Sequence, residues 1–141
     1  MNIFSKSIFF CLISIVLIGC NKKNIKDIQV SGSITDSLSG QPIENAKVTV
    51  LCWYDAGWDK TDYESKDLTT DSNGSYEVSF KEGYKVIVAS VTPEHRKVMY
   101  QLSDLNDTKI KVDLKLSKDS LSKNVSVIDL EDYILSDEGS W

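Results

Sequence analysis

The stretch of residues 30–50 constrains the fold more tightly than any other part of this 141-residue chain. Apolar and polar residues alternate up to Thr35, and the alternation restarts at Ala46, which is the period expected of half-buried β-strands. The residues between them include Asp, Ser, Gly and Pro, which favour turns through side-chain hydrogen bonds, positive φ or a missing amide hydrogen. The stretch therefore predicts a strand, a turn and a second strand.

The same alternation predicts seven short strands, and no stretch shows helical periodicity of comparable strength. They are expected at residues 28–35, 47–54, 67–70, 75–80, 84–91, 98–102 and 109–116. Residues 71–74 give the strongest hairpin signal, because their Asn-Gly pair accepts the positive φ values of a tight turn. Residues 55–66 are expected to form a long irregular insertion. This pattern predicts an all-β, antiparallel Greek-key sandwich, in which two sheets each bury one apolar face.

The first twenty residues have the layout of a secretory signal rather than of a folded element. A start that contains Lys6 precedes an apolar run at residues 8–18, which is too short to span a bilayer comfortably. The run ends in Leu17-Ile18-Gly19-Cys20, which resembles the lipobox of bacterial lipoproteins. An ordinary signal peptide or an uncleaved anchor is the alternative.

The lipobox resemblance implies a signal peptide at residues 1–19 and lipidation of Cys20, with palmitate among the acyl chains. Each buried methylene contributes about 0.8 kcal/mol, so several acyl chains hold a protein on a membrane essentially permanently. Asn21 stands where some inner-membrane lipoproteins carry aspartate, and this favours the outer membrane of the bacterial cell envelope. After the signal peptide we expect the lipidated Cys and a tether at residues 20–26, the folded domain at 27–118 and an acidic C-terminal extension at 119–141. The strand and helix patterns of the extension conflict, so its structure stays open.

Charge and cysteine content exclude several classes of protein. The chain has 16 basic and 21 acidic residues, and Arg96 is its sole arginine, so no surface for nucleic acid is expected. Of the three cysteines, Cys11 leaves with the signal and Cys20 carries lipid, which leaves Cys52 without a disulfide partner. Stability must therefore come from the apolar core.

Four segments together resemble the carboxypeptidase regulatory-like domain, a small transthyretin-like (prealbumin-like) β-sandwich. They are the opening strand with its Gly-Pro turn, TTDSNGSYEVSF, GYKVIVAS and the closing KIKVDLKL, and the resemblance covers residues 29–117. It implies seven strands and an accessory module of the kind found on peptidases, outer-membrane transporters and bacterial lipoproteins. The matching positions are turn and core residues, so the resemblance implies no catalytic residue.

The chain lacks the residues of the enzyme sites that the family name suggests. A carboxypeptidase-type zinc site needs two His and one Glu, whereas His95 is the only histidine. His95 is expected to be a solvated loop residue, and no serine lies in a G-x-S-x-G elbow. Cys52 shares the parity of Val48 and Val50 and is expected to be buried rather than nucleophilic. We therefore predict no enzyme activity, no metal and no cofactor.

Four aromatic residues within eleven positions give the clearest binding signal: Trp53, Tyr54, Trp58 and Tyr63. Exposed Trp and Tyr offer a large rigid contact area at small entropic cost. They predict a surface for a protein partner, with a glycan as the alternative; the competing interpretation is that Trp53 and Tyr63 only cover the sandwich edge. Five carboxylates among residues 55–67 could hold Ca²⁺, although a solvated acidic loop is the favoured interpretation.

The sequence thus predicts a non-catalytic cell-envelope lipoprotein that acts as a protein-binding or scaffolding module. Carbohydrate binding is one alternative, and it requires coplanar exposed rings, either Trp53 with Trp58 or Trp58 with Tyr63. An inhibitor or immunity-type lipoprotein is another alternative, in which the acidic loop or tail blocks an effector.

Overall fold

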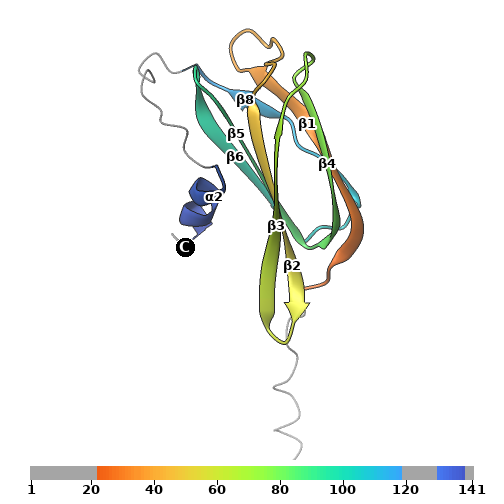
Figure 1. The fold of residues 1–141 in the computed structure, drawn as a ribbon. Helices are drawn as coiled ribbons and strands as arrows, with labels where there is room; N and C mark the ends of the chain where they lie inside the picture. Colours follow the sequence, from red (N-terminus) through yellow and green to blue (C-terminus); the bar gives the residue numbers. More distant parts are fainter. Residues whose placement is uncertain (1–21, 119–129, 139–141) are drawn as a thin grey trace, which may run out of the picture.

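The computed structural model describes residues 22–118 and 130–138, so the expectations for the signal peptide and for Cys20 lie outside the described residues. Two β-sheets pack face to face, and one short helix lies on the outer face of one sheet (Figure 1). The β-sandwich expected from the alternating pattern is therefore confirmed. Within the described part of the chain, no helix is both long and apolar enough to cross a membrane.

Each of the two sheets has four strands. The first sheet contains β4 (Ser75–Gly83), β1 (Ile25–Asp36), β7 (Lys109–Lys111) and β8 (Leu114–Leu116), with β1 in the middle. The second sheet has the order β3 (Lys60–Thr69), β2 (Lys47–Gly57), β5 (Lys85–Thr92) and β6 (His95–Ser103). Because β1 begins at Ile25, the last two residues of the expected tether belong to the first sheet.

The described residues contain eight strands, so the expected count of seven is wrong, as is a wholly antiparallel arrangement. β7 and β8 each pair with β1 in parallel and replace the single strand expected at residues 109–116. The break lies opposite Gly32, where Asp113 Oδ1 accepts the Ser33 amide (2.9 Å). A Cβ on Gly32 would lie 1.7 Å from the Val112 carbonyl oxygen, so this close crossing requires glycine.

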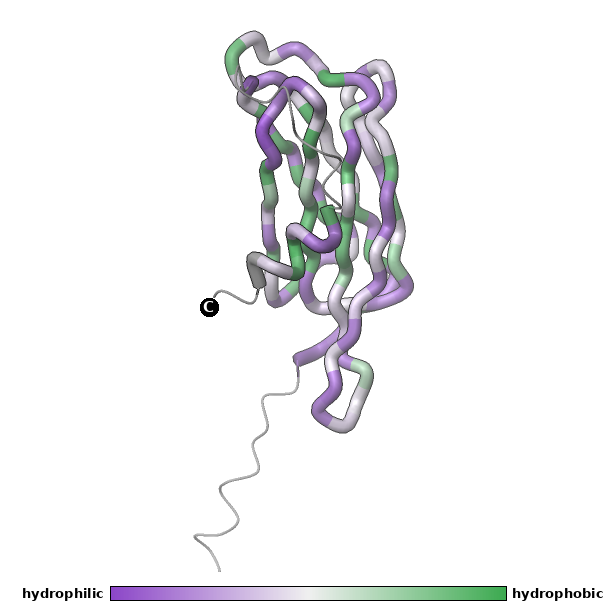
Figure 2. The backbone as a smooth tube through the Cα atoms, turned by 60° about the vertical axis from the view of Figure 1, so that its left-hand side comes forward, coloured by the Kyte–Doolittle hydropathy of each residue, from purple (hydrophilic) through white to green (hydrophobic). Residues whose placement is uncertain are grey.

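Residues 55–66 form the outer part of the paired β2–β3 hairpin, with one shift of register between Asp55 and Gly57, so the expectation of a long irregular insertion is wrong. The two strands pair in antiparallel register from Lys47↔Thr69 to Gly57↔Lys60. The hairpin projects beyond the sandwich at the end where the described chain begins (Figures 1 and 2). Its projecting part is largely exposed, so it needs no apolar alternation, and that is why the sequence pattern missed it.

Residues 71–74 turn the chain as expected, but they do not close a hairpin. β3 pairs with β2 and β4 pairs with β1, so this turn carries the chain from the second sheet to the first. Asp71 Oδ1 accepts the amides of Asn73 (2.9 Å) and Ser75 (2.8 Å), and Gly74 has a φ of 69°. The local turn chemistry was predictable, whereas the partners of the flanking strands were not.

Two apolar clusters hold these elements together. The first lies between the sheets and is made of inward-facing residues that include Ile28, Val30, Ile34, Val48 and Val88. The second lies on the outer face of the second sheet, where α2 (Leu130–Glu138) packs Leu130 and Ile134 against Leu51 and Ile87. This part of the C-terminal extension is therefore helical.

Candidate functional site

The tip of the β2–β3 hairpin presents a tryptophan to solvent, since Trp58 is 98% exposed. Three successive residues there have a positive φ: Gly57 (83°), Trp58 (52°) and Asp59 (58°). Asp55 Oδ1 accepts the Gly57 amide at 2.7 Å and fixes the start of the turn. A positive φ is uncommon for a bulky residue, and such conformations are enriched at binding sites. The turn therefore holds one aromatic ring away from the rest of the molecule.

The segment that precedes β1 is bonded to the base of this hairpin. Asn24 Nδ2 donates to the Asp55 carbonyl (2.9 Å), and the Asp55 amide donates to Asn24 Oδ1 (2.8 Å). Lys22 Nζ lies 4.8 Å from the centre of the Tyr84 ring. An open depression between this segment and the tip is lined by Lys22, Lys23, Asp55, Gly57, Trp58, Asp59, Lys60 and Thr61. The start of the described chain and the hairpin tip thus form one surface.

Two of the four aromatic residues lie under α2 instead of forming a contact surface. The rings of Trp53 and Tyr63 are paired across the ladder, with centroids 5.0 Å apart and planes inclined at 48°. The Tyr63 hydroxyl donates to Glu131 Oε1 on α2 at 3.0 Å. This hydrogen bond, together with burial, raises the pKa of Tyr63. Both rings pack against the second apolar cluster.

The fourth aromatic residue, Tyr54, lies on the flank of the hairpin and is partly exposed. Its hydroxyl donates to Asp62 Oδ2 at 3.3 Å, and burial together with the Asp62 carboxylate raises its pKa. The structure therefore does not bring the four candidate residues together. It places Trp58 at the tip, Tyr54 on the flank, and Trp53 and Tyr63 beneath the helix.

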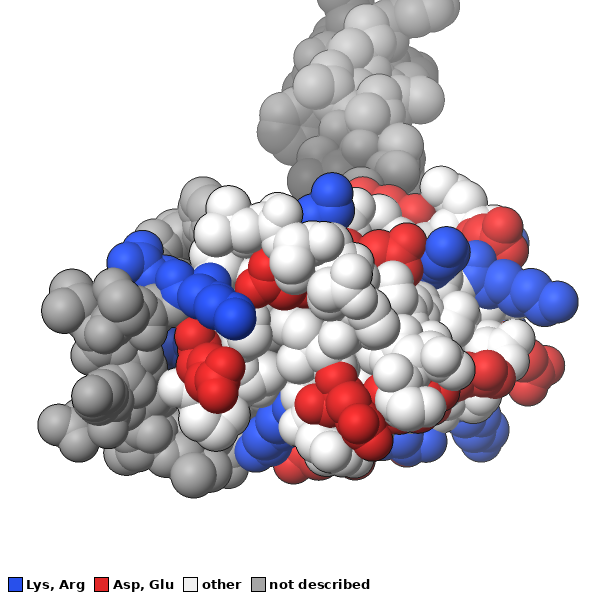
Figure 3. Space-filling model, turned by 90° about the horizontal axis from the view of Figure 1, so that it is seen from above, with Lys and Arg blue, Asp and Glu red and all other residues white. Residues whose placement is uncertain are grey.

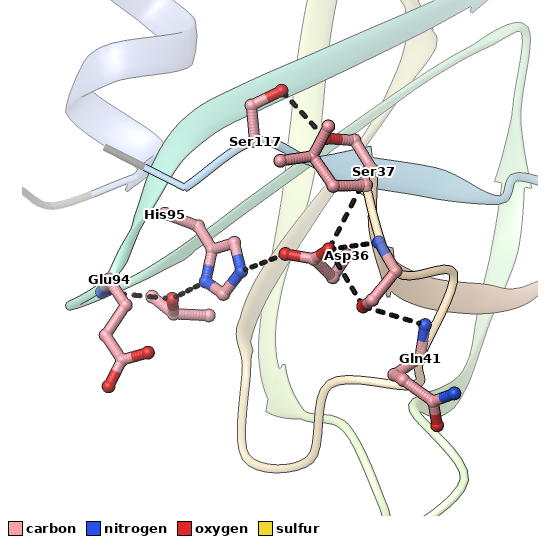
Figure 4. A network of polar contacts seen from close by, with 9 residues as sticks. Asp36, Ser37, Gln41, Glu94, His95 and Ser117 are labelled. Carbon is pink, nitrogen blue, oxygen red and sulfur yellow. Dashed lines mark hydrogen bonds and ion pairs between the residues drawn. The ribbon is translucent and has the colours of Figure 1, made fainter. Parts of the chain in front are cut away.

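The opposite end of the sandwich has interspersed acidic and basic side chains (Figure 3) and a polar network around Asp36 and His95 (Figure 4). His95 Nε2 donates to Asp36 Oδ2 at 3.1 Å, and His95 Nδ1 lies 2.7 Å from the Thr92 hydroxyl. Asp36 Oδ1 accepts the Leu38 amide (3.0 Å) and the amide (2.7 Å) and hydroxyl (2.9 Å) of Ser39. His95 is buried, so the expectation of a solvated loop residue is wrong: a carboxylate 59 positions earlier binds its ring.

The hydrogen bonds to Asp36 hold the pKa of its carboxyl well below its usual range. The amide and hydroxyl of Ser39 have the largest effect, and the His95 ring adds to it. Serine, histidine and aspartate all meet here, yet Ser39 bonds the carboxylate and not the imidazole. A Ser-His-Asp hydrolase needs the serine hydroxyl beside the imidazole; here the hydroxyl beside the imidazole belongs to Thr92, and the His95 ring that it contacts is buried. The network is arranged to join β1 to β6.

Cys52 is a buried core residue, as expected. Burial, with a smaller contribution from Glu64, raises the pKa of its thiol to about 12, so the reactive thiolate is scarce at neutral pH. Among the residues that the structure describes, no three His, Cys, Asp or Glu side chains are placed to share a metal ion. The carboxylates of residues 55–67 are instead spread along the two strands of the hairpin, apart from Asp59, which lies in the turn between them.

Sequence reasoning missed Asn24 and Asp36. Asn24 lies in the expected tether, and nothing in its sequence neighbours marks it as the partner of Asp55. Asp36 is one of the turn-forming residues between the first two expected strands, and its hydrogen bonds to the Leu38 and Ser39 amides confirm that local role. Its second role, as the partner of His95, depends on the fold.

No family model matches this chain, and no curated protein matches it. It is similar in structure to catechol 1,2-dioxygenase from Acinetobacter radioresistens (16% identity, 74% of this chain and 56% of that chain, TM-score 0.51). It is also similar to catechol 1,2-dioxygenase from Pseudomonas arvilla C-1 (11% identity, 74% and 57%, TM-score 0.52) and to the group B streptococcus pilus 2b backbone protein (11% identity, 68% and 43%, TM-score 0.51). The chain thus spans less than two thirds of each of these proteins. At such identities the likeness shows a shared β-sandwich fold of the immunoglobulin-like or transthyretin-like type.

Proposed function

We propose that this chain is a non-catalytic binding or scaffolding module of the bacterial cell envelope, anchored to a membrane through lipidated Cys20. The observation that carries the proposal is the β2–β3 hairpin, which is paired up to its tip and ends in the exposed ring of Trp58. Rigid exposed aromatic residues bind well because little conformational freedom is lost on contact. The hairpin is therefore the contact element of the module.

A non-catalytic role is supported by the surroundings of the two residues that could act in catalysis, His95 and Cys52. Both ring nitrogens of His95 are occupied by Asp36 and Thr92, within a network that joins two strands. Cys52 is buried with a raised thiol pKa. The dioxygenases share a fold with this chain, and fold alone does not carry an activity from one protein to another.

The family proposal follows from the motifs and agrees with the fold. We assign the sandwich to the carboxypeptidase regulatory-like family, on the turn at residues 36–42 and the Thr-Asp-x-x-Gly turn that starts at Thr70. In both turns an aspartate, Asp36 or Asp71, accepts backbone amides, as turn-forming residue types do. Members of that family serve as accessory modules, which is consistent with scaffolding a protein partner at the envelope.

The carbohydrate alternative receives less support from the geometry. It needs two coplanar exposed rings, whereas Trp58 stands alone at the tip and Trp53 is packed against Tyr63 under α2. The inhibitor alternative uses the acidic loop or the acidic tail to block an effector. In the described part of the tail, Glu131 on α2 accepts the Tyr63 hydroxyl, so this carboxylate is engaged with the sandwich. A protein scaffold remains the function that we propose.

The proposal is tested on the full chain expressed in a bacterium and recovered from membranes. The mass of the mature N-terminal peptide should show acyl chains on Cys20, and capture from envelope extracts in detergent should retain a reproducible protein. Trp58→Ala reports whether the tip makes that contact, with Trp58→Phe as a matched control and circular dichroism as the test of folding. A mature chain without lipid, or one that retains no protein, would contradict the proposal.

A further inference from the structure

The described chain starts at the hairpin end of the sandwich, and this fixes where a lipid anchor on Cys20 would lie. Lys22 contacts the Tyr84 ring (4.8 Å), and Asn24 exchanges two hydrogen bonds with Asp55. Cys20 precedes Lys22 by two residues, which span at most about 7 Å when fully extended. An anchor on Cys20 therefore brings the bilayer to the hairpin end.

Trp58 is the side chain that this end offers to a bilayer. It is almost fully exposed, and it sits at the tip of an element that projects beyond the sandwich (Figure 2). Tryptophan concentrates at membrane interfaces, because its amphipathic ring is stable at the level of the lipid headgroups. The Asp55–Gly57 hydrogen bond already fixes the turn, so seating the ring orders little additional chain.

The charges around Trp58 are nearly balanced. The depression beside it is lined by three lysines (Lys22, Lys23 and Lys60) and two aspartates (Asp55 and Asp59). Basic clusters attract anionic lipids, whereas a mixed set such as this one adds little net attraction. Contact with a bilayer here would therefore depend on the ring and on the anchor, and only weakly on lipid charge.

We infer that the hairpin tip rests on the bilayer that holds Cys20, with Trp58 among the lipid headgroups. The inference rests on the proposed function, because it requires the lipid anchor on Cys20. It deepens that function by naming the bilayer as the surface that the β2–β3 hairpin meets. The sandwich then stands on its hairpin end, and the Asp36–His95 network lies at the far end.

Depth-dependent fluorescence quenching tests the inference on the lipidated full chain in phosphatidylcholine vesicles. The double variant Trp53→Phe/Trp141→Phe retains Trp58, and Trp58→Phe/Trp141→Phe retains Trp53 as the matched control. Phospholipids that carry a nitroxide near the headgroup should quench Trp58 at least about twofold more than Trp53. Replacing a quarter of the lipid with phosphatidylglycerol should change the Trp58 signal by less than about twofold. Equal quenching of the two residues would overturn the inference.

A second variant keeps the test decisive if Trp53→Phe disturbs the fold. Cys52 is buried and Cys20 would be acylated, so a cysteine introduced by Asp59→Cys is the single reactive thiol for a spin label. Leu38→Cys is the control, because Leu38 is exposed on the turn at the opposite end. The label at position 59 should be shielded from a water-soluble relaxation agent, and the label at position 38 should not. Equal access at both positions would contradict membrane contact.

The mass of the purified chain separates failure of the inference from failure of the proposed function. If Cys20 carries no lipid, the anchor and the proposed function fail together with the inference. If Cys20 is lipidated and Trp58 is not quenched, the envelope lipoprotein stands and only the membrane contact is overturned. Loss of a captured protein in Trp58→Ala would likewise assign the tip to that protein and overturn the inference.

Discussion

The two ends of the sandwich use their most distinctive side chains in opposite ways. At one end Asp36 and His95, which could serve chemistry in another setting, are buried and hydrogen-bonded within the framework. At the other end Trp58, which would be a core residue in most proteins, is exposed on an ordered turn. The comparison teaches that residue type alone does not reveal a site. The contacts that already occupy a side chain decide whether it is free to act.

The largest effect is expected at the end that carries the network. His95→Ala should lower the free energy of unfolding by about 3 kcal/mol, because it leaves Asp36 Oδ2 without its donor and opens a cavity beside it. Urea denaturation at pH 7 measures the loss. Glu94→Ala, on the same turn with an exposed side chain, is the control and should stay within about 0.5 kcal/mol. Equal effects would show that the network does not stabilise the fold.

A smaller effect is expected on the outer face, which separates the two ends. Ile134→Ala should cost about 2 kcal/mol, because Ile134 is fully buried between α2 and the second sheet. Asp132→Ala, exposed on the same helix, should cost a few tenths of a kcal/mol. Urea unfolding followed through Trp53 emission makes the measurement. If Ile134→Ala does not change the free energy of unfolding, the outer face of the second sheet does not form a second core.

The pH dependence of stability sharpens the view of Asp36. Its folded pKa is lowered, so its stabilising contribution is complete above its unfolded pKa, near 3.8, and is lost progressively as pH falls toward the folded pKa. The stability difference between wild type and Asp36→Asn should therefore shrink as the pH falls below 4. Thermal unfolding across that range checks the sign. A difference that grows toward low pH would contradict it.

The smallest effect is expected at the exposed end. Trp58→Ala should leave the free energy of unfolding within about 0.5 kcal/mol of wild type, because the ring is 98% exposed. The measurement is urea unfolding of the chain in detergent, free of bilayer. A loss comparable to that of His95→Ala would mean that Trp58 supports the fold, and the contrast between the two ends would disappear.

Local structure was predictable from the sequence wherever it depended on residues that are close together in the chain. The alternation around Val48 and Val50 and the turn at Asp36 are built as expected. The turn at Asp71 is also present, although it joins the two sheets and does not close the expected hairpin. The burial of Cys52 followed from its parity in the same strand.

Long-range pairing was not predictable in the same way. The closing strand reads as one alternating run, yet it is split because the main chain crosses close over Gly32. His95 looks like a loop residue until Asp36 is brought to it by the fold. The candidate site was found only in part, because the packing of α2 against the cluster that includes Trp53 is long-range, whereas Trp58 lies exposed at the hairpin tip.

The parallel pairing of β1 with β7 and β8 has a consequence for the timing of folding. Ser33 in β1 bonds Asp113, 80 positions later, and a chain synthesised at roughly 5–20 residues per second needs about 4–16 s to make that interval. The first strand is thus made early and receives two of its partners last, which also slows closure of the sandwich by raising the contact order. Throughout that delay the nascent chain has no complete sheet around β1, so the sandwich closes only after its last two strands have been made.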